Sequence, residues 1–235
     1  MKMQTNDKVL MIIPAYNEAG SIEKVISELK DDYPQYDYVV VTDGSTDGTD
    51  RICMENGYNH VRLSANLGLT GCFQTGMKYA YRYGYPYAVQ FDGDGQHRPE
   101  FIEAMKTKMD EGYDIVMGSR FIMEDGSMKG MRALGSRLIK MAIKLTTGTL
   151  VTDPTCGLRM YNQKMIDIFA NRLNYAPEPD TISYLIKNGA RVAEVPVKVA
   201  ERESGQSYLK PLNAIKYMLR MLVSIVVIQN FREKG

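Results

Sequence analysis

Short apolar runs alternate with longer polar-and-apolar segments through the first two-thirds of the chain. Runs of this length, bounded by turn-forming residues, predict buried β-strands. The predicted strands are Val9–Ile13, Tyr38–Thr42, His60–Leu63, Tyr87–Phe91 and Asp114–Gly118. A later segment, Arg191–Val199, alternates and contains Pro196, which predicts an edge strand.

Helical periodicity separates the predicted strands. In Ser21–Leu29, apolar residues recur at steps of three and four, and similar patterns cover about 49–56, 70–83 and 99–109. Strands that alternate with helices predict an α/β fold, with a mostly parallel central sheet flanked by helices. The regular alternation ends after Arg120.

Polar groups follow four of the predicted strands. They are the segment Pro14–Glu18, then Asp43, then Asp92 with Asp94, then Arg120. Ligands of open parallel sheets bind beyond the carboxyl ends of the strands. Acids after three separate strands therefore predict one pocket for ribose hydroxyls, a base edge and a metal. The alternative is a set of independent helix caps.

The stretch Val89–His97 contains two aspartates, Asp92 and Asp94, each followed by a glycine. Paired carboxylates can offer oxygens to a hard divalent cation, which usually keeps other positions open for substrate phosphates. An acidic turn that closes a strand is the alternative, because Asp and Gly are ordinary turn residues.

Composition narrows the class of protein. A net charge of +1 over 235 residues gives no sign of nucleic-acid binding. The cysteines Cys53, Cys72 and Cys156 lack metal-site spacing and predict free thiols in a reducing compartment. The apolar run at Val9–Ile13 is too short for a signal sequence, and no run approaches the ~20 residues of a membrane-spanning helix.

The segment from Gly126 to Thr152 has no acidic residue. Within it, Lys129–Leu145 predicts a basic amphipathic helix, of the kind that lies on an anionic membrane surface. A core-facing helix with a solvated basic face is the alternative.

The C-terminal segment is the second candidate for a surface contact. We expect one domain over 1–209 and a C-terminal amphipathic helix within 210–235. Its stretch Met221–Ile228 is apolar almost all round but rises only about 12 Å, so it cannot cross a bilayer. It could lie in the membrane interface, form a homo-oligomer or meet a membrane-embedded partner.

Six stretches together, in this order and spacing, resemble the family 2 inverting glycosyltransferases with the GT-A fold. The resemblance is strongest to the polyprenyl-phosphate sugar synthases, such as the dolichyl-phosphate mannose synthases. The stretches are Pro14–Glu18, Asp43–Thr49, Asn66–Gly68, Asp92–His97, Gly118–Arg120 and Arg202–Ser207.

This resemblance implies a role for each site residue. Pro14, Tyr16 and Glu18 are expected to line the nucleoside pocket and Asp43 to hold the base. Asp92 is expected on the ribose side, and Asp94 and Gln96 as ligands of Mg²⁺ or Mn²⁺, with Asp92 beside them as a further ligand. Arg120 and Arg202 are expected to meet donor and acceptor phosphates, and Ser207 to contact the donor. We expect His97 to be a positioning neighbour.

The chemistry by which the nucleotide diphosphate leaves agrees with these roles. The leaving nucleotide diphosphate develops negative charge, which a metal and an arginine can stabilise without donating a proton. A lipid phosphate acceptor is already anionic, whereas a sugar hydroxyl requires a general base. Three acids could provide that base: Asp153, Glu178 and Asp180. The alternatives for them are a turn cap and a helix start.

The sequence is consistent with three functions. The favoured one is transfer of a sugar from a UDP- or GDP-linked donor to polyprenyl phosphate by a cytoplasmic protein bound peripherally at the inner membrane face. The second is extension of a cell-surface polysaccharide at a sugar hydroxyl. The third is a non-catalytic sensor of nucleotide sugars.

Overall fold

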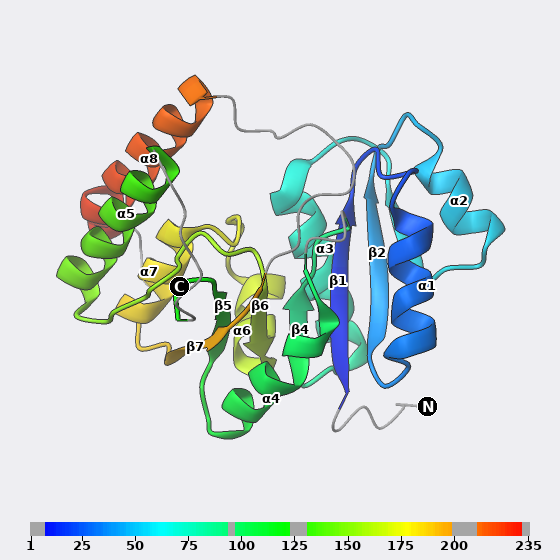
Figure 1. Ribbon diagram of the computed structural model, residues 1–235, viewed down its shortest axis with the longest axis horizontal. Helices are drawn as coiled ribbons and strands as arrows, with labels where there is room; N and C mark the ends of the chain where they lie inside the picture. Colours follow the sequence, from blue (N-terminus) through cyan, green and yellow to red (C-terminus); the bar gives the residue numbers. More distant parts are fainter. Residues whose placement is uncertain (1–7, 94–96, 123–130, 199–210, 232–235) are drawn as a thin grey trace.

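A computed structural model describes residues 8–93, 97–122, 131–198 and 211–231 (Figure 1). Seven strands form one sheet in the order β3-β2-β1-β4-β6-β5-β7. The strands are β1 (Val9–Ala15), β2 (Asp37–Asp43), β3 (His60–Leu63), β4 (Tyr87–Gln90), β5 (Ile115–Ser119), β6 (Arg159–Asn162) and β7 (Val192–Pro196). The predicted α/β class with a mostly parallel sheet is confirmed.

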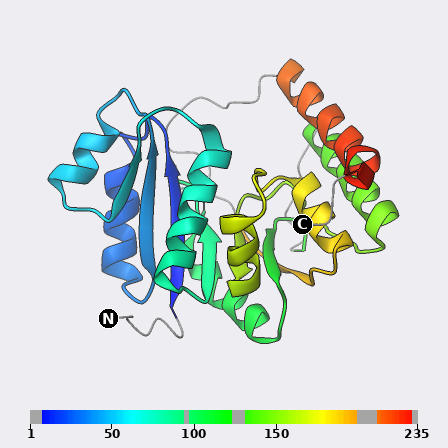
Figure 2. The same ribbon diagram turned by 180° about the vertical axis from the view of Figure 1, so that it is seen from behind.

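Helices cover both faces of the sheet (Figures 1 and 2). One face packs on α3 (Gly68–Tyr83) and α6 (Gln163–Asn171), where the rings of Phe73, Tyr161 and Phe169 meet edge to face with centroids 5.0 to 5.4 Å apart. The other face packs on α1 (Ile22–Asp32) and α4 (Ile102–Asp110), which follows the short 3-10 helix η1 (Pro99–Phe101). Burial on both faces explains why the strands are near-continuous apolar runs.

The first four strands are parallel, and each is joined to the next by a crossover segment that contains a helix. β1 pairs in parallel with β2 and β4, and β2 pairs in parallel with β3. The crossover between β2 and β3 is α2 (Thr49–Glu55). The predicted strands and helices of this half agree with the structure to within a few residues at each end.

The strand β6 was not predicted from the sequence. It spans only Arg159–Asn162 and runs antiparallel to both of its neighbours, β4 and β5. A strand of four residues carries little periodicity, and its partners are distant in sequence. The predicted edge strand is confirmed as β7, which pairs only with β5 in the described sheet and ends at Pro196.

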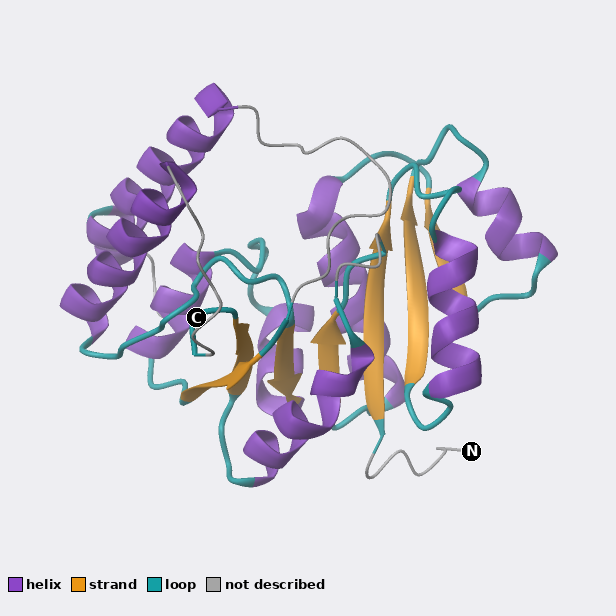
Figure 3. Cartoon of the chain, in the orientation of Figure 1, coloured by secondary structure: helices purple, strands orange, loops and turns teal. Residues whose placement is uncertain are grey.

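Two helices, α5 (Met131–Thr147) and α8 (Pro211–Val226), lie side by side at one end of the molecule (Figures 1 and 3). They pack on α7 (Pro179–Lys187), and α8 is followed by a second 3-10 helix, η2 (Ile228–Phe231). Met221 and Ile225 of α8 are buried in the main core. In the described part of the chain, no helix combines the length and apolarity that a membrane span requires. The division at residue 209 stays a prediction.

Candidate functional site

The carboxyl ends of four strands meet at one edge of the sheet. β1, β2 and β4 are parallel, and β5 points the same way because β6 is antiparallel to both β4 and β5. The loops that follow these strands carry the polar groups singled out in the sequence. The fold therefore gathers Pro14–Glu18, Asp43, Asp92 and Arg120 at one edge, as the strand-end pattern predicts.

The loops after β1 and β2 are tied together by hydrogen bonds. Asn17 has a left-handed backbone, with φ of 56°, and its side-chain oxygen accepts from the Thr46 amide at 2.8 Å. The Glu18 amide donates to Thr49 Oγ1 at 2.9 Å, and the Ala19 amide donates to Asp47 at 2.9 Å. The polar loop that follows β2 thus holds the one that follows β1. Tyr16 is exposed beside them, where a ligand could reach its ring.

Asp43 is buried at the end of β2 and anchors the loop before α3. Its two oxygens accept from the Leu67 amide at 2.6 Å and the Gly68 amide at 2.8 Å. Gly44 allows this approach, because a Cβ there would lie 2.9 Å from the Asn66 nitrogen and its φ is +64°. A carboxylate has about four acceptor sites, and these two amides use two of them. The predicted contact of Asp43 with a nucleoside base stays a prediction.

Asp92 follows β4 and lies beside His97. The Asp92 amide donates to His97 Nδ1 at 3.3 Å, and the side-chain oxygen Oδ2 of Asp92 lies 3.5 Å from the same nitrogen. His97 is buried, edge-on to the Phe91 ring. A Cβ on Gly157 would lie 3.2 Å from the imidazole and 3.4 Å from Asp92 Oδ2. His97 therefore contacts Asp92 directly, and its role as a positioning neighbour stays a prediction.

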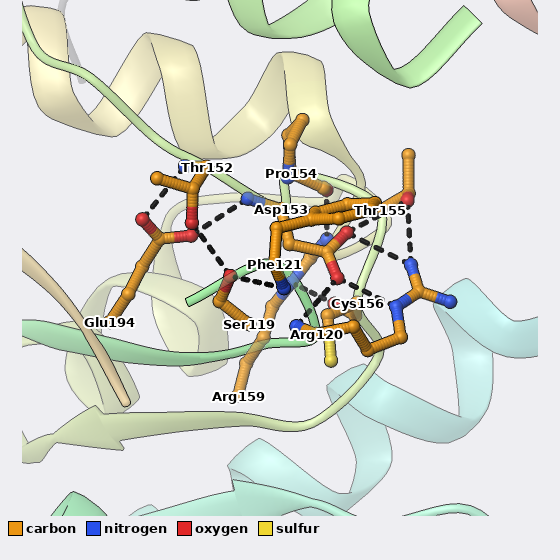
Figure 4. A network of polar contacts seen from close by, with 10 residues as sticks. All are labelled: Ser119, Arg120, Phe121, Thr152, Asp153, Pro154, Thr155, Cys156, Arg159 and Glu194. Atoms are coloured by element: carbon orange, nitrogen blue, oxygen red, sulfur yellow. Dashed lines mark hydrogen bonds and ion pairs between the residues drawn. The ribbon is translucent and has the colours of Figure 1, made fainter. Parts of the chain in front are cut away.

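Hydrogen bonds to Asp153 hold the Arg120 side chain in place (Figure 4). Arg120 Nε and Nη2 donate to the two carboxylate oxygens at 2.6 and 2.9 Å, and the Arg120 amide adds a third bond at 3.2 Å. Thr155 Oγ1 accepts from Arg120 Nη2 at 3.0 Å and donates to Asp153 at 3.1 Å. The pKa of Arg120 is raised chiefly by its hydrogen bond to Asp153. The guanidinium is thus charged and held in one orientation.

This geometry argues against Asp153 as a general base. Its side chain is fully buried, and its two oxygens accept four hydrogen bonds, from three Arg120 groups and Thr155. That number uses the acceptor capacity of a carboxylate. Asp153 instead positions Arg120.

Two further residues that the sequence analysis missed support the same turn. Glu194 of β7 accepts from the amides of Thr152 and Asp153 at 2.7 and 2.8 Å. The buried Arg159 donates to the carbonyls of Pro154 and Cys156 and to that of Pro177. The one feature of the sequence that could have pointed to Glu194 is that it is an acidic residue between the apolar residues of a predicted edge strand.

Glu178 and Asp180 face α8. Arg220 Nη2 donates to both oxygens of Glu178 at 2.9 and 3.1 Å. Asp180 is buried, and its Oδ2 accepts from Ser224 Oγ at 2.6 Å. Burial raises the pKa of Glu178, and Arg220 opposes that rise. Both acids therefore have structural partners on the C-terminal helix.

Four predicted site residues lie outside the described residues: Asp94, Gln96, Arg202 and Ser207. Within the described ranges, no three acidic, histidine or cysteine side chains cluster closely enough to hold a metal ion. The ligand set predicted from Asp92, Asp94 and Gln96 stays a prediction.

Comparisons with known proteins identify the family of this chain. The family described as Glycosyl transferase family 2 matches residues 11–169. An undecaprenyl-phosphate mannosyltransferase of Micrococcus luteus is 33% identical over 216 residues, which cover 85% of this chain and 86% of the relative. A polyprenol monophosphomannose synthase of Mycolicibacterium smegmatis is 28% identical over 232 residues, which cover 93% of this chain and 87% of that protein.

The fold also has a solved counterpart. Glucosyl-3-phosphoglycerate synthase from Mycobacterium tuberculosis, crystallised with Mn²⁺, uridine diphosphate and phosphoglyceric acid, superposes with a TM-score of 0.69 at 17% identity. The superposition covers 99% of this chain and 81% of that one, and at this identity it establishes the fold alone. The family match and the Micrococcus relative go further, and they show that this chain belongs to glycosyl transferase family 2.

Proposed function

We propose that this glycosyltransferase moves a sugar from a nucleotide-sugar donor to polyprenyl phosphate. One observation carries the choice of acceptor: the acids that could serve as a general base have other partners. Asp153 is saturated by Arg120 and Thr155, Asp180 is bonded to Ser224, and Glu178 is paired with Arg220. Because each of these three acids in the described part of the chain already has a partner, the site suits an acceptor that is already anionic.

The reaction needs no proton transfer. An oxygen of the lipid phosphate attacks the anomeric carbon and forms the new C–O bond, while the bond to the donor diphosphate breaks and the nucleotide diphosphate leaves with the electron pair. The configuration at the anomeric carbon inverts. The names of the two curated relatives, a polyprenol monophosphomannose synthase and an undecaprenyl-phosphate mannosyltransferase, support this acceptor class.

Arg120 is the described cation best placed to meet phosphate oxygens. It follows β5 at the edge where the other strand-end groups lie, and Asp153 and Thr155 fix the guanidinium. Its side chain is 27% exposed, so a ligand can reach it. A pre-oriented arginine stabilises developing charge on a leaving diphosphate without reorganising during the reaction. Arg202 is proposed for the acceptor side from the family resemblance.

The residues present also suit a divalent metal. The Asp92 side chain is 35% exposed at the strand end, so it can offer a carboxylate oxygen, the donor type that Mg²⁺ and Mn²⁺ prefer. Asp94 and Gln96 would complete the protein ligands. When bound, the ion would neutralise charge on the donor diphosphate. Pro14, Tyr16, Glu18 and Asp43 are proposed to surround the nucleoside.

We also propose that α5 and α8 contact the membrane that holds the lipid acceptor. Leu138, Met141 and Leu145 form one exposed apolar stripe on α5, and Leu219, Val223 and Val226 form another on α8. Exposed Arg137, Lys144 and Lys216 accompany them. Apolar side chains among basic residues suit an anionic lipid surface, which supports a peripheral position at the inner membrane face.

The decisive experiment offers the purified protein a panel of UDP- and GDP-sugars with undecaprenyl phosphate, Mg²⁺ or Mn²⁺ and a detergent. We expect one donor to yield a lipid-linked sugar, identified by its mass. An oligosaccharide product with no lipid product would instead support the polysaccharide function. In that case Glu178, the candidate base with a raised pKa, should be essential, and Glu178→Gln should abolish the transfer.

A further inference from the structure

We infer that Glu194 is a positioning residue for the reaction, which acts on Arg120 through the turn that carries Asp153. It lies on β7, outside every motif that the sequence analysis singled out. The inference rests on the proposed function for its catalytic part, because Arg120 is there assigned to phosphate.

One carboxylate, that of Glu194, anchors two consecutive backbone amides. Glu194 Oε2 accepts from the Thr152 amide at 2.7 Å and Oε1 accepts from the Asp153 amide at 2.8 Å (Figure 4). Charge-assisted bonds of this length are stronger than neutral ones. Both oxygens are used at once, so the pair of bonds fixes the orientation of the backbone at Asp153 as well as its position.

The Asp153 side chain links that backbone to the Arg120 guanidinium. The Asp153 carboxylate meets Arg120 through Nε and Nη2 at 2.6 and 2.9 Å, a geometry that tolerates little rotation of either group. A second link runs in parallel, because Thr152 Oγ1 lies 2.6 Å from Ser119 Oγ, next to Arg120 in sequence. A shift of the Thr152–Asp153 backbone would therefore move Arg120.

The other end of the turn has its own support. Arg159 donates to the carbonyls of Pro154 and Cys156 at 2.8 and 3.0 Å, independently of Glu194. Loss of the Glu194 carboxylate should consequently loosen the Thr152–Asp153 end and leave the turn in place. The strand itself is held by its pairing with β5, in which Glu194 lies opposite Met117.

The test uses Glu194→Gln, which keeps the size of the side chain but replaces one acceptor oxygen by a donor group that faces an amide. Glu111→Gln is the matched control, since Glu111 pairs only with Lys108 on the surface among the contacts described for it. Thermal unfolding of both variants verifies that they fold.

Two readouts separate positioning from a merely structural role. The first is the NMR signal of the Arg120 Nε–H group, identified by its loss in Arg120→Lys. We expect it to shift or broaden in Glu194→Gln, while the Arg159 Nε–H signal stays unchanged. An unchanged Arg120 signal overturns the inference, and this readout does not depend on which acceptor the enzyme uses.

The second readout is a double-mutant cycle on kcat and KM. We expect Glu194→Gln to lower kcat about tenfold or more, with the donor KM changed less than about threefold, because the arginine acts on the transition state. In an Arg120→Lys background the same change should cost less than about twofold, since the two residues act as one unit. Effects that multiply instead overturn the inference. If the wild-type enzyme makes no lipid-linked sugar, the proposed function fails, and the cycle is run on whichever acceptor is used.

Discussion

Gly135 of α5 lies directly against Met218 of α8. A Cβ built on Gly135 would be 1.5 Å from the Met218 sulfur, far inside any permitted contact. With the Met218 side chain in this position, residue 135 has no room for a side chain of its own. This contact joins the C-terminal helix to the rest of the molecule, together with the buried Met221 and Ile225.

Gly135→Ala should therefore destabilise the protein by about 1–3 kcal/mol, the usual cost of overpacking a tight contact. Chemical denaturation measures the loss. Gly20→Ala is the control, because a Cβ there meets no atom within 4 Å. The double variant Gly135→Ala/Met218→Ala should recover part of the stability. A single variant as stable as the wild type would contradict the close packing.

Reversal of the basic residues Arg132, Arg137 and Lys140 to Glu should release the protein from anionic vesicles in flotation assays. Each basic residue near an anionic surface contributes roughly 1 kcal/mol, so binding should also weaken with salt. Lipid glycosylation should fall while donor hydrolysis persists. A triple reversal at exposed Arg51, Lys78 and Arg82 changes the net charge equally and should leave binding intact. Wild-type protein that stays off such vesicles at low salt would rule out the membrane contact.

Asp94→Asn should abolish most of the turnover without unfolding the protein, because the change removes a ligand charge and little volume. Circular dichroism checks the fold, and activity is titrated with Mg²⁺ and Mn²⁺. Chelation of the wild type by EDTA should give the same loss. Near-normal activity in EDTA would contradict a metal role for Asp92 and Asp94.

The acid stability of the protein should depend on Asp114. Burial alone raises the pKa of this carboxyl, but the Arg191 amide, Asn162 and Lys164 together hold it below its usual value. A lowered folded-state pKa adds stability above the unfolded pKa of about 4, which is lost as the pH falls through the folded value. Asp114→Asn should thus cost on the order of 1–3 kcal/mol at pH 7 and progressively less below about pH 4. Denaturation curves across this range test it, and a pH-independent difference would contradict it.

The three cysteines should resist alkylation in the folded protein. All are free and buried, and burial raises the pKa of Cys53 and Cys156 to about 11 and that of Cys72 to about 12. The thiolate is the reactive form, so little of it exists near neutral pH. Labelling followed by mass spectrometry should find no modified thiol until denaturant is added. Rapid labelling of Cys156 in the native protein would show that the turn beside Arg120 opens.

The sequence by itself determined the strand and helix order of the first half of the chain. Runs such as Val9–Ile13 and helical patterns such as Ser21–Leu29 are local features of the sequence. A strand buried on both faces needs a continuous apolar run, and a helix that packs on the sheet needs apolar residues at steps of three and four. The sequence was likewise sufficient to predict that the polar groups at strand ends lie at one edge of the sheet, because parallel strands bring their carboxyl ends together.

Only the tertiary structure decided what the acids after residue 150 do. Asp153 meets Arg120 from 33 positions away, and its amide meets Glu194 from 41 positions away. Local sequence periodicity carries no information about contacts between residues so far apart. From the sequence alone Asp153 could be a general base, whereas in the fold it is the partner of an arginine. The antiparallel β6 was missed for the same reason, since its four residues owe their conformation to β4 and β5 on either side. Separation along the chain hides these contacts, and packing alone creates them.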